Sequence, residues 1–382
     1  MSRFRDPAGI DLTIGQKFMR VPWYVIAVMA LIVAIGLASL YSVAGGSFSP
    51  WGERHVVRFL AGTGLMLLIA VVPRNLWLGL ANPAYLGALV LVGAVLFIGT
   101  EGGGAKRWLS VGGITFQPSE LMKLALILAL ARYYQWLGPE RVSHPLWMIA
   151  PILIIAAPVG LTLLQPDLGT AVLLSVIGFA IMFLAGVHIL YFLGGGVSAA
   201  VALPYVWSML HPYQRKRLEV FLNPETDPLG AGYHIAQSKI ALWAGGLTGR
   251  GFMQGTQSQL DFLPEKRTDF IFTMFAEEWG FVGSVVLISL FALLTVMLLS
   301  MASRCTSAFS RLVIAGTAVM IFVYAFINVA MVSGLVPVVG VPLPLVSYGG
   351  TSMLTVLMAV GLSMCAYVHR GQAMPRRIGA LV

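Results

Sequence analysis

An aspartate, Asp269, stands where a charged stretch meets a hydrophobic run: FLPEKRTDFIF (262–272) leads into apolar residues that continue to Met301. Two roles suit a carboxylate in that place. It can cap the helix that begins there, because Thr268 and Asp269 are both favourable N-cap residues. It can also exchange a proton with a molecule that reaches the membrane from the polar side. The elements around Asp269 must decide between these roles.

Other ionisable residues lie inside predicted membrane helices. Glu120 ends the motif FQPSE and Lys123 follows three residues later, so both lie on one helix face. A charge at a helix centre costs about 2.5 to 3.5 kcal/mol on insertion scales, so it usually lines a cavity or has a partner. One interpretation is a cap with a structural ion pair, and the other is that Lys123 faces a phosphate. Capping explains Asp167, and at least one of Glu277 and Glu278 should face the bundle interior.

Three residues with affinity for phosphate or lipid, Lys106, Arg107 and Trp108, lie among glycines in GGGAKRWLSVGG (102–113). Glycines allow a backbone to approach a ligand closely, and an arginine can bind phosphate oxygens through two hydrogen bonds. An interfacial tryptophan with basic neighbours that reach toward lipid headgroups explains the same residues. Combined with Lys123, the cluster favours an outward-facing site for an anion attached to an apolar group.

Composition predicts that these residues belong to an all-α polytopic membrane protein. Of the 382 residues, 58% are hydrophobic and 10% are charged, and the mean hydropathy is +0.87. A bilayer core needs about 20 apolar residues per helix. On this criterion about ten spans are expected, at 23–44, 56–73, 76–99, 118–137, 146–164, 168–186, 189–210, 270–301, 312–333 and 345–368.

Basic residues in the short loops predict the orientation of the chain. With the N-terminus inside, most of them fall on the cytoplasmic side, so both the N-terminal segment 1–22 and the tail 370–382 are expected in the cytoplasm. One long segment, 211–269, is then external and joins the seventh and eighth helices. We interpret the chain, 1–382, as a single membrane domain. Its net charge of +9 reflects topology and contact with membrane lipid, and no nucleic-acid partner is expected.

The external segment is expected to form short amphipathic helices that fold back over the membrane and cover the site. YHIAQSKIALW (233–243) has apolar residues at helical spacing between glycine breaks. The glycines that follow allow a sharp turn in GTQSQ, where hydroxyl and amide groups can bind sugar hydroxyls. Ser258 and Gln259, with Glu265 farther along, are therefore candidate substrate-binding residues.

A second irregular stretch, SGLVPVVGVPLPLVSYGG (333–350), separates the last two helices. Broken backbone at membrane depth is tolerated only where it is buried in protein or lines a cavity. This loop is expected to form a wall of the outward cavity, with Ser347 and Tyr348 as candidate sugar or phosphate contacts. Asn328, in the middle of the ninth helix, is expected to make an interhelical hydrogen bond.

Six motifs follow one another along the chain: GAKRWL, FQPSE, QPDLGT, NPETDPLGAGYH, GTQSQLDFLPEKRTDFIF and GLVPVVGVPLPLVSYGGTS. Together they resemble the SEDS family (shape, elongation, division and sporulation). The motifs run from residue 104 to residue 352, and the ten-helix pattern covers nearly the whole chain. The forms DPLGAGYH and PVVGVPLPLVSYGG are more similar to the elongation-type (RodA) branch than to the division-type branch.

The resemblance implies a peptidoglycan glycosyltransferase that polymerises lipid II on the outer face of the bacterial cytoplasmic membrane during cell elongation. The family's essential acidic residue falls on the aspartate of TDF, which is Asp269, with an implied role as general base toward the 4-hydroxyl of the acceptor GlcNAc. Arg107 and Lys123 would hold the departing diphosphate. An α-linked donor that gives a β-1,4 product implies inversion. One departure is Arg267, where several relatives carry histidine.

The resemblance also implies a partner, a class B penicillin-binding protein that acts as the elongation transpeptidase, with its contact at the outer ends of the eighth and ninth helices. A lipid II flippase is the alternative function. The acidic residues cluster on the outer side and no convincing internal repeat is found, which favours the enzyme. No cofactor is certain. A divalent cation between Asp269 and the diphosphate stays an alternative, although one carboxylate is too little to predict a metal site built by the protein.

Overall fold

The computed structural model describes residues 13–102, 105–209, 215, 219–221, 223, 231–256, 266–372 and 374. Within this part of the chain, ten long helices occupy the positions of the ten predicted spans: α2 (Trp23–Val43), α3 (Trp51–Val71), α4 (Arg74–Ile98), α5 (Pro118–Leu137), α6 (Pro145–Leu164), α7 (Leu168–Ala185), α8 (Ile189–Met209), α12 (Ile271–Ser303), α13 (Ala308–Val332) and α14 (Gly350–Val368). The shorter helices are α1 (Ile14–Met19), the 3₁₀ turn η1 (Pro139–Arg141) and α10 (Ala231–Gly245). Ser258, Gln259 and Glu265 lie outside the described residues, as do residues 1–12 and most of the predicted tail.

Eight of the long helices are long and apolar enough to cross a membrane, which confirms a polytopic helical membrane fold. The two others are α5 and α8. The apolar stretch of α8 is shorter, at Ile189–Ala202. Three charged residues, Glu120, Lys123 and Arg132, interrupt α5, whose side chains are buried along most of its length. Because other helices surround α5, its charges contact protein instead of lipid.

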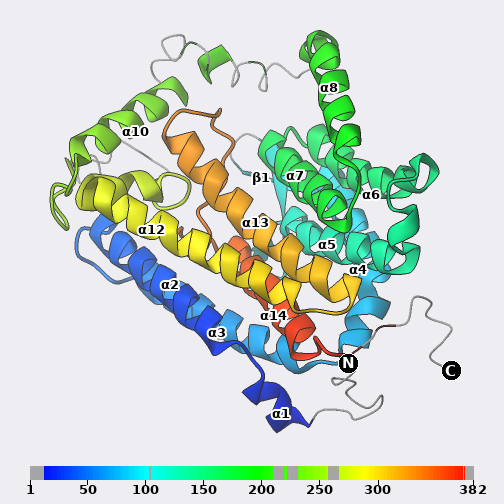
Figure 1. Cartoon of the computed structure of the whole chain (residues 1–382). Helices are drawn as coiled ribbons and strands as arrows, with labels where there is room; N and C mark the ends of the chain where they lie inside the picture. The colour runs from blue at the N-terminus through cyan, green and yellow to red at the C-terminus, as the bar shows by residue number, and fades with distance from the viewer. Residues whose placement is uncertain are drawn as a thin grey trace.

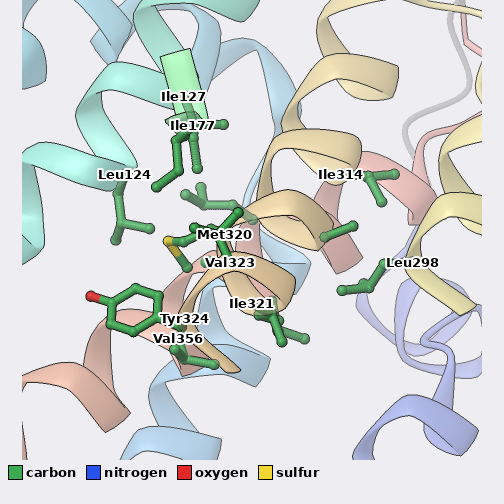
Figure 2. Packing of buried hydrophobic residues seen from close by; sticks show 14 of the residues in the cluster. Leu124, Ile127, Ile177, Leu298, Ile314, Met320, Ile321, Val323, Tyr324 and Val356 are labelled. Carbon is green, nitrogen blue, oxygen red and sulfur yellow. The ribbon is translucent and has the colours of Figure 1, made fainter. Parts of the chain in front are cut away.

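The centre of the bundle is α13, which packs against α5, α7, α12 and α14 (Figure 1). Figure 2 shows this core, where Leu124 of α5 and Ile177 of α7 approach Met320 and Tyr324 of α13. Such dense apolar packing fixes the helices relative to one another. Tyr324 is fully buried, and its hydroxyl lies at the edge of the apolar cluster.

A small antiparallel sheet, which the all-helical prediction did not include, follows α4. It has the order β1 (Thr100–Gly102), β2 (Ala105–Val111) and β3 (Ile114–Phe116). Gly112 and Gly113 form the turn between β2 and β3, with φ values of 58° and 81°. Two consecutive positive φ angles are the signature of a type I′ hairpin turn, which glycine adopts without strain. The sheet places β2 in contact with α5.

The eighth predicted span is interrupted inside the membrane-spanning helix. Gly280 of α12 has φ 65° and ψ −162°, which is not helical. Four backbone hydrogen bonds join segment 246–251 to α12 across this break, two to the carbonyls of 277–278 and two from the amides of 281–282. They satisfy backbone groups that the helix cannot satisfy itself. We call residues 245–256 with 277–282 the α10–α12 junction.

The stretch between α13 and α14 is irregular, and residues 343–347 within it are buried, which is where broken backbone at membrane depth is tolerated. Its Val346 packs so closely on α2 that a Cβ at Gly36 would lie 2.7 Å from Val346 Cα. On another side, the His55 ring of α3 lies within hydrogen-bond distance of the Leu345 carbonyl, at 3.0 Å. The loop is therefore held inside the bundle, and α14 begins only at Gly350.

Candidate functional site

A cavity of about 460 Å³ opens where β2, the starts of α5 and α7, and the α13–α14 loop meet the residues before α12. Its lining brings together five of the predicted site residues, which are Arg107, Trp108, Glu120, Lys123 and Asp269. They are up to 162 positions apart in the sequence, counted from 107 to 269. The fold thus gathers two of the predicted acids, Asp269 and Glu120, with two cations and an aromatic ring around a single space.

Asp269 does not cap α12. The N-cap of that helix is Phe270, and it has no side-chain capping hydrogen bond. Asp269 is half-buried and lines the cavity. Its carboxylate faces the α13–α14 loop so closely that a Cβ at Gly340 would lie 3.4 Å from Oδ2. Of the two roles that the sequence allows for Asp269, the geometry excludes that of helix cap.

Glu120 and Lys123 form a buried ion pair with a third member from α13. Lys123 Nζ lies 2.7 Å from Glu120 Oε1, and it also donates to the Tyr324 hydroxyl. The Tyr324 hydroxyl in turn lies 2.9 and 2.8 Å from the two Glu120 oxygens. The ion-pair interpretation is confirmed, and all three side chains also line the cavity. A buried charge is tolerated because its partner and hydrogen bonds are in place.

Arg107 is paired with Asp167 across the cavity wall. Its Nε lies 3.7 Å from Asp167 Oδ2, and its Nη2 donates to the Pro166 carbonyl at 3.1 Å. Asp167 caps α7 as predicted, accepting from the amide and hydroxyl of Thr170 at 3.3 and 2.8 Å. Lys106, the neighbour of Arg107 on β2, is exposed and does not line the cavity. Of the two predicted cations on β2, only Arg107 therefore lines the cavity.

Ser347 lies behind the cavity wall and contacts backbone. It is 3% exposed, its Oγ accepts from the Leu343 amide at 2.8 Å and donates to the Thr268 carbonyl at 2.6 Å. Tyr348, its neighbour, lines the cavity, and the Arg58 guanidinium lies 4.6 Å from the centre of its ring.

His234 is a cavity residue that the sequence analysis did not single out. It is half-buried on α10, and its ring lies 6.2 Å from that of Phe270. One turn later, Ser238 fixes α10 by hydrogen bonds to Thr273 Oγ1 at 2.8 Å and to the Val332 carbonyl at 2.7 Å. The available signal was its place in a predicted amphipathic helix over the site. Among the described residues, no group of three or more His, Cys, Asp and Glu could hold a metal ion.

Glu277 and Glu278 are both buried, at 0% and 3% exposure, and neither lines the cavity. Glu277 Oε1 accepts from the Thr256 amide and hydroxyl at 2.8 and 2.9 Å. Glu278 Oε1 accepts from the Ser42 hydroxyl of α2. Both acids therefore belong to the α10–α12 junction.

Comparison with known proteins agrees with this architecture over almost the whole chain. The model of the FtsW, RodA and SpoVE family, described as cell cycle protein, matches residues 18–372. The peptidoglycan glycosyltransferase MrdB of Escherichia coli K12 is 41% identical over 364 residues, covering 94% of this chain and 96% of that protein.

Two solved structures are similar to the computed model. A chain of a peptidoglycan synthase complex, described as coordinating polymerization and crosslinking, has a TM-score of 0.78 and 35% identity and covers 92% of this chain and 99% of its own. RodA of Thermus thermophilus has a TM-score of 0.71 and 30% identity, with 92% and 98% coverage. With its apolar helices, this kinship makes the chain an integral protein of the bacterial inner membrane. The chain belongs to the FtsW, RodA and SpoVE family, which is the SEDS family of membrane proteins.

Proposed function

We propose that the chain is a peptidoglycan glycosyltransferase of cell elongation, which polymerises lipid II in its cavity with Asp269 as the general base. The relative MrdB is named a peptidoglycan glycosyltransferase, and its similarity extends over 94% of the chain. The single observation that carries the assignment of the site is that Asp269 lines a cavity together with Arg107 and Lys123 while another residue caps α12.

The chemistry requires one proton transfer and one displacement. Asp269 takes the proton of the acceptor 4-hydroxyl, and the acceptor oxygen attacks the anomeric carbon of the donor sugar. The bond between that carbon and the diphosphate oxygen breaks, and the diphosphate leaves with both electrons. A single displacement inverts the anomeric carbon, so no covalent intermediate forms. General base catalysis of this kind typically contributes about 10²- to 10⁴-fold.

The two cations serve the leaving diphosphate differently. Arg107 has a long contact of 3.7 Å with Asp167 and one hydrogen bond, of 3.1 Å, to the Pro166 carbonyl, so most of its guanidinium donors can turn to phosphate oxygens. Lys123 is 1% exposed and tightly bound to Glu120 and Tyr324. We therefore assign direct contact with the diphosphate to Arg107. Lys123 contributes mainly by its positive charge and by shaping the wall.

The cavity end of the bundle faces the outside of the cytoplasmic membrane in this proposal. The sugar and diphosphate of lipid II then occupy the cavity while the lipid tail stays in the bilayer. The positions of short-loop basic residues support this orientation. The α10 helix, which contributes His234 to the lining, covers the site from the polar side.

The test is glycan synthesis by the purified chain with an elongation transpeptidase and lipid II. Wild type is compared with Asp269→Asn, which keeps the shape of the side chain, and with Glu53→Gln, which neutralises an exposed carboxylate on α3. We expect glycan strands from wild type and Glu53→Gln and none from Asp269→Asn. Equal product from Asp269→Asn would reject Asp269 as the base. No product from any of the three, with lipid II transported across vesicle membranes, would favour a flippase.

The partner in this proposal is a class B penicillin-binding protein, whose single membrane helix docks between α12 and α13. An apolar groove of about 280 Å³ lies there, with Ala292 and Ala325 in it and the exposed rings of Phe322 and Phe326 beside them. Small residues flanked by large ones let a neighbouring helix approach closely in a membrane. The solved complex with a similar chain, described as coordinating polymerization and crosslinking, supports a partner of this kind.

Filling the groove tests this contact. Ala325→Trp is expected to abolish co-purification with the transpeptidase, because the added ring occupies the space of the partner helix. Phe97→Trp is the matched control, since Phe97 is exposed on α4 away from the groove. Undiminished co-purification of Ala325→Trp would place the partner elsewhere.

A further inference from the structure

Three successive backbone carbonyls lead up to α12, and each accepts a hydrogen bond from the α13 side of the bundle. The Tyr348 amide donates to the carbonyl of 267 at 2.9 Å, and the Ser347 hydroxyl donates to that of 268 at 2.6 Å. The Asn328 amide group donates to the carbonyl of Asp269 itself, at 2.8 Å. Residues before an N-cap have no helical partners, so the protein must satisfy them from elsewhere. We call Asn328, Ser347 and the Tyr348 amide the carbonyl clamp.

Asn328 holds two walls of the cavity at once. Its Nδ2 donates to the Asp269 carbonyl and, at 2.7 Å, to the carbonyl of Val341 in the α13–α14 loop. Two carbonyl acceptors fix which end of the side-chain amide faces them, because an amide oxygen there would be repelled. Asn328 Oδ1 is buried and has no hydrogen-bond partner in the described part of the chain. An unpaired buried acceptor costs about 1 to 3 kcal/mol, so Asn328 is not placed there for stability alone.

The clamp extends to the carboxylate through the loop. Gly340 precedes the residue that Asn328 holds, and it has φ 70°. A Cβ at Gly340 would lie 3.4 Å from Asp269 Oδ2, so the loop backbone is in contact range of the carboxylate. Asn328 therefore sets the backbone position of Asp269 and the distance of the loop surface against which its carboxylate lies.

We infer that Asn328 and Ser347 are positioning residues for Asp269, which fix the proposed base relative to the acceptor hydroxyl. This inference rests on the proposed glycosyltransferase function. Neither side chain lines the cavity, so neither contacts the substrate. They act through Asp269, and their loss changes the rate of the chemical step and leaves substrate binding intact. A misplacement of about 1 Å at a reacting group can cost on the order of 10²-fold in rate.

The test measures kcat and KM for lipid II polymerisation by full-length variants in vesicles. Asn328→Asp keeps the shape but presents oxygens to both carbonyls, and it is expected to lower kcat about 10- to 100-fold with KM unchanged. Ser347→Ala removes one bond of the clamp and is expected to lower kcat less, about tenfold. Ser347→Thr keeps the hydroxyl and should restore kcat to within about twofold of wild type.

Thr317→Val is the matched control. Thr317 is also buried on α13, where its hydroxyl bonds to the carbonyls of Val313 and, in α14, Ala359, but it does not line the cavity. Its kcat should match wild type. Thermal unfolding is measured for every variant. If Asn328→Asp does not fold, the comparison of Ser347→Ala with Ser347→Thr tests the positioning role.

A fall in kcat at constant KM, with rescue by Ser347→Thr, supports the clamp. The inference is overturned if folded variants keep the wild-type kcat, if KM rises instead, or if activity only follows the amount of folded protein and Ser347→Thr gives no rescue. A silent wild type or an active Asp269→Asn overturns the proposed function and this inference with it, which distinguishes that failure from failure of the clamp alone.

Discussion

Two acidic regions lie within ten residues of one another along the chain, and the protein uses their carboxylates in opposite ways. At the cavity, side-chain and backbone donors reach the carbonyls of 267–269, and the carboxylate of Asp269 lines the open space. At the α10–α12 junction, hydrogen bonds are donated to the carboxylates themselves, by Thr256 to Glu277 and by Ser42 to Glu278. In our proposal the first arrangement holds an acid in place for a substrate, whereas in the second the acids bind other parts of the fold.

The difference teaches that the place of a carboxylate in the fold, more than its residue type, separates the proposed catalytic acid Asp269 from the structural acids Glu277 and Glu278. A break at membrane depth exposes backbone groups that water cannot satisfy. The junction meets this demand with segment 246–251 and with Glu277, whose carboxylate accepts a hydrogen bond from the amide of Thr256. Glu277 and Glu278, held in this way, do not line the cavity.

The largest expected difference between the two regions is in the polymerisation rate after one carboxylate in each is neutralised. Asp269→Asn is expected to lower the polymerisation rate about 10²- to 10⁴-fold in folded protein, because the proposed general base is lost. Glu277→Gln should keep the rate within a few-fold, since its amide oxygen can still accept from Thr256. Rates and thermal unfolding of both variants check this. A comparable rate loss in folded Glu277→Gln would break the distinction between the two regions.

The Glu120–Lys123 pair combines features of the two regions. Both side chains line the cavity, but their opposite charges are paired with each other. Lys123→Met leaves Glu120 buried without its cation, which is expected to cost about 3 to 5 kcal/mol of unfolding free energy. The double variant Lys123→Met/Glu120→Gln should recover much of this loss. Denaturant unfolding measures both. If the single variant is as stable as wild type, the pair is not needed for the fold and serves the substrate only.

Close packing of glycines at the junction predicts the next effect. A Cβ at Gly249, which has φ 84°, would lie 2.0 Å from the Glu278 carbonyl oxygen. Gly246 also has a positive φ, 52°, but a Cβ there meets nothing within 4 Å. Gly249→Ala is therefore expected to lose more stability than the roughly 1 to 2 kcal/mol that backbone strain alone gives to Gly246→Ala. Equal melting temperatures for the two variants would contradict the tight junction.

Most of the long helices of this fold could be predicted from sequence because eight of them are long apolar runs. The interruption of α12 could not, since a glycine inside a membrane helix is common and the conformation of Gly280 depends on partners at 246–251. The small sheet at 100–116 was missed for a related reason. Its strands are short and are separated by glycines, and they show no clear alternation of apolar and polar residues.

For the site, the motifs indicated most of the cavity residues but not how they are arranged. Capping explained Asp167 completely on local grounds, so its contact with Arg107, 60 positions away, was not foreseen. Ser347 was expected at the substrate, and its bond to the Thr268 carbonyl depends on how the loop packs. Local patterns report helix ends well, whereas contacts between distant segments need the fold.

The smallest expected effect tests whether the junction acts through its backbone. Thr256→Val removes the hydroxyl bond of 2.9 Å to Glu277 and one of 3.2 Å from Arg250, but it leaves the amide bond of 2.8 Å to Glu277. The unfolding free energy should fall by about 0.5 to 1.5 kcal/mol, the typical contribution of a hydrogen bond, with an unchanged polymerisation rate. Differential scanning calorimetry of the variant measures its stability, and polymerisation rates are measured at one lipid II concentration. A large rate loss at this small cost in stability would show that the contact between Thr256 and Glu277 affects the reaction in the cavity. The junction would then help to position Asp269 as well as to stabilise the fold.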